Sequence, residues 1–162
     1  LFIAYVLTQV EIGNQHLLYF LPLIPLMGGQ VAVQASTIMV RGIAVGGIQK
    51  RMLMRFLSKQ VLITFMLSVA CAVATGALGA TVVEGAGWSV MAGVAGGVFV
   101  AIMIAGTLGM TLPLGFDKVG IDPAVSAGPF ITMLNDLICI FIYISLGTLL
   151  ASGAQDITAV LP

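Results

Sequence analysis

Asp136 is a carboxylate inside a stretch that is otherwise apolar enough to cross a membrane, over residues 129–150. A helix of about 20 residues matches the hydrocarbon core of a bilayer. An ionised carboxylate at that depth costs at least roughly 2.5–3.5 kcal/mol, so we expect Asp136 to face a water-filled cavity or a partner and not lipid. The chemistry open to it there is cation binding. Helical spacing places further residues on the same face: Thr132, Cys139, Tyr143 and Gly147.

Two proline-containing dipeptides interrupt the helical pattern just ahead of this stretch. Asp122-Pro123 predicts a capped helix start, and Gly128-Pro129 repeats the break a few residues later. Irregular backbone at membrane depth is tolerated where protein covers it or where it lines a cavity. The breaks therefore indicate a site or a pathway near the start of the last span.

A second row of polar residues lies in a span predicted over residues 17–45. Two prolines and a glycine pair predict that this helix is broken near its start: Pro22, Pro25 and Gly28-Gly29. Beyond them, polar side chains recur at helical spacing: Gln30, Gln34, Thr37 and Arg41. These residues either bond neighbouring helices, at about 0.6 kcal/mol per contact, or line a pore opposite Asp136.

The elements that must position these residues are membrane-spanning helices. Of the 162 residues, 60% are hydrophobic and 7% are charged, whereas about a quarter of the residues are charged in soluble domains. The pattern predicts an all-α, polytopic membrane protein with five transmembrane helices, over residues 1–12, 17–45, 61–83, 89–112 and 129–150. The first is too short to span a bilayer, so we interpret it as a truncated helix. We expect residues 1–162 to form a single ion-conducting transmembrane domain from a longer protein.

Basic residues indicate the orientation. Five of the six lie between Arg41 and Lys59, which predicts a cytoplasmic loop by the positive-inside rule. The crossings then place a linker over residues 113–128 inside and the C-terminus outside. We therefore expect a multi-pass protein of the cell's inner (plasma) membrane, in contact with membrane lipids.

The charge balance and the absence of certain motifs argue against several other classes of function. The six acidic and six basic residues cancel, so we expect no nucleic-acid partner. His16 is the single histidine, and Cys71 and Cys139 lie inside predicted spans, so no zinc-type ligand set is present. Without a nucleophile paired with a base, or a phosphate-binding loop, we predict no enzyme activity and no organic cofactor.

Two segments carry a resemblance to a known family. GIDPA, GPF, Asn135-Asp136 and IYISLG resemble the last transmembrane helix of the MgtE-type magnesium channels, which are related to eukaryotic solute-carrier magnesium transporters. PLMGGQVAVQASTIMVRGIA, over residues 25–44, resembles the second helix of that family. The resemblance implies a homodimer whose interface forms a pore lined by the second and fifth helices. It places Asp136 in the central ion site and Asp122 nearer the cytoplasmic mouth, with regulatory cytoplasmic domains outside this chain.

Magnesium suits such a pore because Mg²⁺ prefers oxygen ligands and keeps several of its waters. Asp136 would supply the charge, and neutral oxygens are expected from Gln30, Gln34, Thr37, Thr132 and Asn135. Three positions depart from the family pattern. Gln30 replaces its first amide, Ala32 replaces a glycine, and Gly128 replaces an asparagine that would line the pore near Asp122. These departures leave the choice among Mg²⁺, Mn²⁺, Co²⁺, Ca²⁺ and Na⁺ open.

Two other functions fit the same residues. A proton- or sodium-coupled cation carrier would use Asp136 as its coupling site. A non-conducting membrane assembly subunit would instead pair Asp136 with Arg41 of a neighbouring helix. Dependence of the flux on a proton or sodium gradient favours the carrier, and loss of assembly in Asp136→Asn favours the assembly subunit.

Overall fold

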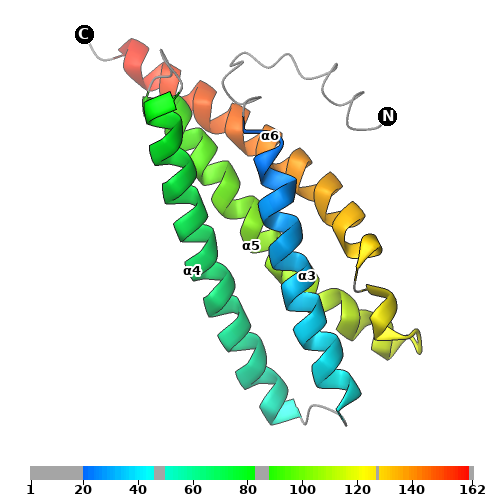
Figure 1. The fold of residues 1–162 in the computed structure, drawn as a ribbon. Coiled ribbons are helices and arrows are strands. Elements are labelled where there is room, and N and C mark those ends of the chain that lie inside the picture. The colour runs from blue at the N-terminus through cyan, green and yellow to red at the C-terminus, as the bar shows by residue number, and fades with distance from the viewer. Residues whose placement is uncertain (1–19, 46–49, 83–87, 127, 161–162) are drawn as a thin grey trace.

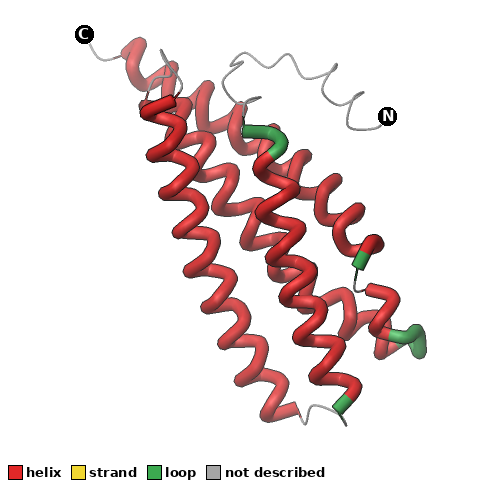
Figure 2. The backbone as a smooth tube through the Cα atoms, in the orientation of Figure 1, coloured by secondary structure: helices red, strands yellow, loops and turns green. Residues whose placement is uncertain are grey.

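The described part of the chain is a bundle of helices. The computed structural model describes residues 20–45, 50–82, 88–126 and 128–160, and these residues form helices and short turns (Figure 2). The helices are α3 (Leu23–Ala44), α4 (Lys50–Val82), α5 (Trp88–Lys118), the short 3₁₀ helix η1 (Pro123–Ser126) and α6 (Pro129–Val160). Among the described residues, four segments are long and apolar enough to cross a membrane: Leu23–Ala44, Met54–Thr81, Val90–Lys118 and Pro129–Leu146.

The prediction of an all-α, polytopic membrane protein is confirmed. The count of five helices is not, because the helix expected over residues 1–12 lies outside the described residues.

The central helix of the bundle is α5. It packs against α3, α4 and α6, whereas α3 and α4 make few contacts with each other (Figure 1). Small and branched apolar side chains of α5 form the middle of the core at helical spacing: Val94, Val98, Ala101, Ile102 and Ala105. On one side of α5, α3 and α6 also pack against each other, and they run in opposite directions (Figure 1).

The break predicted at the glycine pair of α3 is wrong. The helix continues from Leu23 through Gly28 and Gly29, and both glycines are buried. Pro22 precedes the helix and Pro25 lies in its first turn, where a missing N–H removes no helical hydrogen bond. The glycines mark a place of close packing inside a continuous helix.

α4 and α5 extend beyond the predicted spans. α4 begins at Lys50 instead of residue 61, so Arg55 and Lys59 lie on exposed positions of a helix and not in a loop. Long basic side chains can keep their charges in water while the helix continues, and for that reason the apolar pattern missed these turns.

The linker predicted over residues 113–128 is also too long. α5 continues through Pro113 to Lys118, and the proline is buried in the bundle, where packing against neighbouring helices compensates for its lost hydrogen bond. At the other end of the chain, α6 continues to Val160, beyond residue 150 where the predicted span ends.

The predicted break ahead of the last span is confirmed. Asp122 Oδ1 accepts a hydrogen bond from the Ala124 N–H at 2.9 Å and so caps η1, which begins at Pro123. Gly128 has φ of +95°, a conformation that glycine adopts without strain, and Pro129 begins α6 directly after it. Because η1 packs against α5 and α3, protein covers this irregular backbone on one side.

Candidate ion site at the α3–α6 seam

Asp136 lies where α6 crosses α3. Its Oδ1 is 3.7 Å from the point that a β-carbon on Gly29 would occupy, and the side chain is half-buried. The carboxylate is about 10 Å along the axis from the start of α6, inside the membrane span Pro129–Leu146. We call this contact the α3–α6 seam, defined by Gly28 and Gly29 of α3 and by Asn135, Asp136 and Cys139 of α6. Asp136 lies at its edge.

Gly28 makes the inner side of the seam tight. A β-carbon there would stand 3.0 Å from Cys139 Sγ and 3.2 Å from Asn135 Nδ2. Asn135 is 1% exposed, and its Oδ1 accepts a hydrogen bond from the Cys139 thiol at 3.3 Å. The same thiol is 3.5 Å from the Ala101 carbonyl oxygen of α5. Asn135, which we expected to line a pore, is therefore enclosed within the chain.

The polar face predicted on α6 divides along the helix. Thr132 and Asp136 are half-buried, whereas Cys139 and Tyr143 are fully buried. Tyr143 packs closely on α5, where a β-carbon at Gly97 would stand 2.8 Å from its ring. The first part of this face is therefore partly accessible, whereas its later part is buried in the bundle core. Gly147, also expected on this face, lies beyond the residues whose side chains are described.

The polar residues of α3 share an exposed face: Gln30, Gln34, Thr37 and Arg41. The Thr37 hydroxyl donates to the Val33 carbonyl oxygen at 2.8 Å, so its own oxygen can still accept a hydrogen bond. Arg41 is twelve residues from Gly29, or about 18 Å along the helix, so it lies far from Asp136 of the same chain. Exposed amides inside a membrane span need water or another protein surface beside them.

The remaining candidates lie toward η1. The Thr132 hydroxyl donates to the Pro129 carbonyl oxygen at 2.9 Å. Gly128 offers backbone only, and its carbonyl oxygen accepts from the Thr132 N–H at 3.3 Å. Asp122 is exposed and uses one carboxylate oxygen in its cap, which leaves the other free for water or a cation. The described residues contain no group of three or more His, Cys, Asp or Glu that could hold a metal ion, so any cation here would need water or ligands from a second copy.

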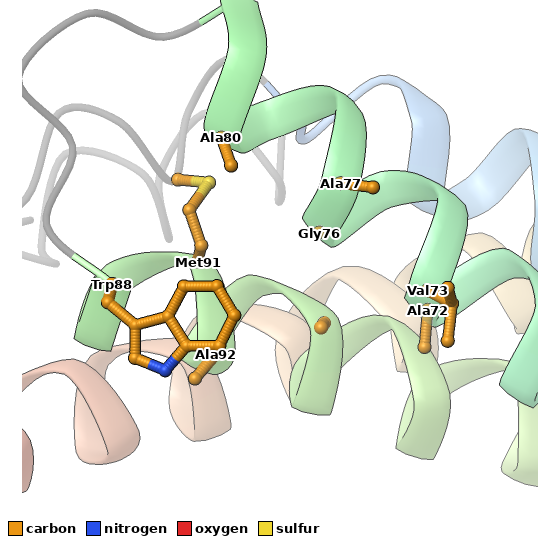
Figure 3. Close-up of a pocket in the computed structure, with 9 residues that line it drawn as sticks. Ala72, Val73, Gly76, Ala77, Ala80, Trp88, Met91 and Ala92 are labelled. Atoms are coloured by element: carbon orange, nitrogen blue, oxygen red, sulfur yellow. The ribbon is translucent and has the colours of Figure 1, made fainter.

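A cavity between α4 and α5 does not fit a cation. Its volume is about 400 Å³, and Figure 3 shows Trp88 and Met91 of α5 at one end of it, opposite Ala80 of α4. The other lining residues are alanine, valine or glycine: Ala72, Val73, Gly76, Ala77, Ala92 and Ala95. These side chains provide no oxygen ligand, so the α3–α6 seam is the better candidate for an ion site.

Sequence reasoning missed the role of Gly28 and Gly29. Small residues permit close helix approach in membranes, but the sequence pattern alone predicts a break at this pair. The glycine pair is followed directly by Gln30 and Gln34, which are four residues apart on one helical face. This combination of small and polar residues was the available signal that α3 packs closely against another polar helix.

Long apolar helices, with exposed amides on α3 and a half-buried carboxylate on α6 inside the membrane-spanning segments, define a multi-pass membrane protein. The chain belongs to the MgtE family of divalent cation transporters, whose family model matches residues 21–146. All of the candidate residues fall inside the matched segment.

Two curated proteins resemble the chain. It is 26% identical to the magnesium transporter MgtE of Bacillus subtilis (strain 168) over 134 residues, which cover 82% of this chain and 29% of that protein. It is 45% identical to the magnesium transporter MgtE of Enterococcus faecalis (strain ATCC 700802 / V583) over 49 residues, which cover 30% of this chain and 11% of that protein. The match therefore spans less than a third of either relative.

Proposed function

We propose that this chain is the transmembrane part of a magnesium transporter and that it moves hydrated divalent cations through a pore at a homodimer interface lined by α3 and α6. The observation that carries the proposal is the exposed polar row of α3 beside the half-buried Asp136. Lipid would not solvate these side chains, and membership of a divalent cation transporter family supports water and cations as their surroundings.

A second copy of the chain lines the other side of the proposed pore. In an isologous dimer the same surface of each copy meets its counterpart, so two rows of amides and two copies of Asp136 face one passage. Two carboxylates attract a divalent cation more strongly than one does, and waters kept by Mg²⁺ can mediate the contacts without holding the ion too tightly to leave.

The residues take different roles along the passage. Asp136 supplies the charge at the central site, and Asp122 gathers cations near the cytoplasmic mouth. Gln30, Gln34, Thr37 and Thr132 contact the water shell of the ion, and Gly128 offers its backbone carbonyl. Regulatory domains outside this chain would control opening.

Replacement of Asp136 tests the proposal. We expect Asp136→Ala in the full-length protein to abolish Mg²⁺ entry into proteoliposomes that contain a magnesium-sensitive dye, because no other carboxylate lies in the seam. Asp117→Ala is the matched control, since Asp117 is an exposed carboxylate at the end of α5 and away from the seam. Wild-type Mg²⁺ entry in a folded, dimeric Asp136→Ala protein would contradict the proposal.

The same preparation separates the other functions. Competition by Mn²⁺, Co²⁺ and Ca²⁺ measures the ion preference, and a Mg²⁺ flux that follows an imposed proton or sodium gradient would indicate a coupled carrier. If the wild-type protein conducts nothing and Asp136→Asn loses its dimer, Asp136 has an assembly role instead.

A further inference from the structure

Asn135 is a buried polar residue whose hydrogen bonds are only partly satisfied. Its Oδ1 accepts from the Cys139 thiol, but its Nδ2 finds no hydrogen-bond partner within the described part of the chain. The Nδ2 lies 3.2 Å from the β-carbon position of Gly28 and 3.8 Å from that of Gly29. An enclosed donor without a partner lowers stability, so a leucine of similar size would serve packing better. Stability alone therefore does not explain an amide at this position.

The position of Asn135 determines where Asp136 points. Consecutive residues of an α-helix differ by about 100° around the axis. Because Asn135 is directed inward at Gly28, Asp136 is directed along the edge of the seam at Gly29, where its Oδ1 lies 3.7 Å from the β-carbon position. A side-chain oxygen lies roughly 5–6 Å from the helix axis, so a rotation of α6 by about 20° would move the carboxylate by about 2 Å.

We propose that Asn135 is a positioning residue, which fixes the rotation of α6 against the glycine pair of α3 and thereby holds the Asp136 carboxylate toward the ion path. The Cys139 thiol orients the amide through Oδ1, and Gly28 provides the space that the amide occupies. The inference rests on the proposed function of Asp136. The attraction between a carboxylate and a cation falls as their separation grows, so control of this rotation matters for transport.

The first test compares Asn135→Leu with wild type in proteoliposomes of the full-length protein. Leucine fills the space but cannot bond Cys139, so we expect the half-saturating Mg²⁺ concentration to rise by about tenfold as the carboxylate moves about 2 Å from the ion, while the melting temperature stays the same or increases. A residue with a purely structural role would change the amount or stability of folded protein and leave half-saturation of the folded fraction unaltered.

Cys139 supplies a matched pair of variants. Cys139→Ser keeps a donor for Asn135 Oδ1, so we expect it to raise the half-saturating Mg²⁺ concentration less than Cys139→Ala does. Cys139→Ala removes the donor, and we expect part of the Asn135→Leu effect. Combining Cys139→Ala with Asn135→Leu should add little to Asn135→Leu alone, because both changes remove the same interaction.

A second measurement is independent of transport. Asp136→Cys is labelled with a water-soluble maleimide, with and without Asn135→Leu, after Cys71 is replaced by alanine. We expect the labelling rate to change severalfold when Asn135 is replaced, because the thiol then moves relative to the seam. If wild type admits no Mg²⁺, the proposed function fails and the labelling comparison still decides the role of Asn135. Unchanged labelling in the Asn135→Leu background would overturn the inference.

Discussion

Individual glycines determine how closely the helices of this bundle approach. At Gly109 of α5, a β-carbon would overlap the Ala32 carbonyl oxygen of α3 and would stand 2.9 Å from the Ala35 β-carbon. A backbone carbonyl cannot move aside unless the helix moves with it, so the contact between α3 and α5 depends on a residue without a side chain. Gly115 of the same helix has no atom within 4 Å of its β-carbon position.

These two glycines form a matched pair for a stability measurement. We expect Gly109→Ala to cost about 1–3 kcal/mol or more through overpacking and to lower the Tm in detergent. Gly115→Ala should leave the Tm unchanged or raise it slightly, because alanine favours a helix more than glycine does. Equal Tm values for the two variants would show that close approach at Gly109 is unimportant.

At the residue scale, the sequence predicts which side chains are unusual but not which way they face. Asp136 was recognisable because a charge is costly in an apolar stretch. Asn135 was expected to line a pore and is enclosed in the chain instead. Periodicity gives the angle between neighbouring residues, whereas the packing of α3 and α5 against α6 decides which of the two is inside. Such tertiary contacts cannot be inferred from the local sequence around Asn135 and Asp136.

At the scale of elements, local stereochemistry predicted the breaks better than the helix ends. Asp122-Pro123 and Gly128-Pro129 interrupt the helical pattern as expected, since proline fixes its own φ and glycine adopts a positive φ without strain. The ends of α4 and α5 could not be found in the same way. Lys50 begins a helix that extends beyond the apolar segment, and Pro113 is held inside a helix by its buried surroundings.

Two substitutions at Asp122 separate its cap from its charge. Asp122→Ala removes the acceptor for the Ala124 N–H, so we expect a loss of stability of up to about 0.5–2 kcal/mol, by analogy with helix caps. Asp122→Asn keeps an oxygen acceptor and should retain the Tm of wild type. If the charge also gathers cations at the mouth of the pore, both variants should raise the half-saturating Mg²⁺ concentration. An equal drop in Tm for both variants would argue against the cap.

At the scale of the whole molecule, two helices expose surfaces of different character. α4 exposes large apolar side chains such as Leu62 and Met66, at 59% and 65% exposure, as expected for a face toward lipid. α3 exposes Gln30 and Gln34 inside a membrane span. This difference does not depend on any relative, and it predicts that a second copy approaches along α3 and not along α4.

Cross-linking of single cysteines tests that arrangement. With Cys71 replaced by alanine, we expect Gln34→Cys to form a covalent dimer with a short bifunctional maleimide, because a thiol in a water-filled passage can ionise and react and its counterpart lies across the two-fold axis. Met66→Cys should remain monomeric on a denaturing gel, since a thiol facing lipid neither ionises nor meets a partner. The buried Cys139 is common to both proteins and should not react. Cross-linking through Met66→Cys, with none through Gln34→Cys, would place the dimer interface on α4 and remove the passage along α3.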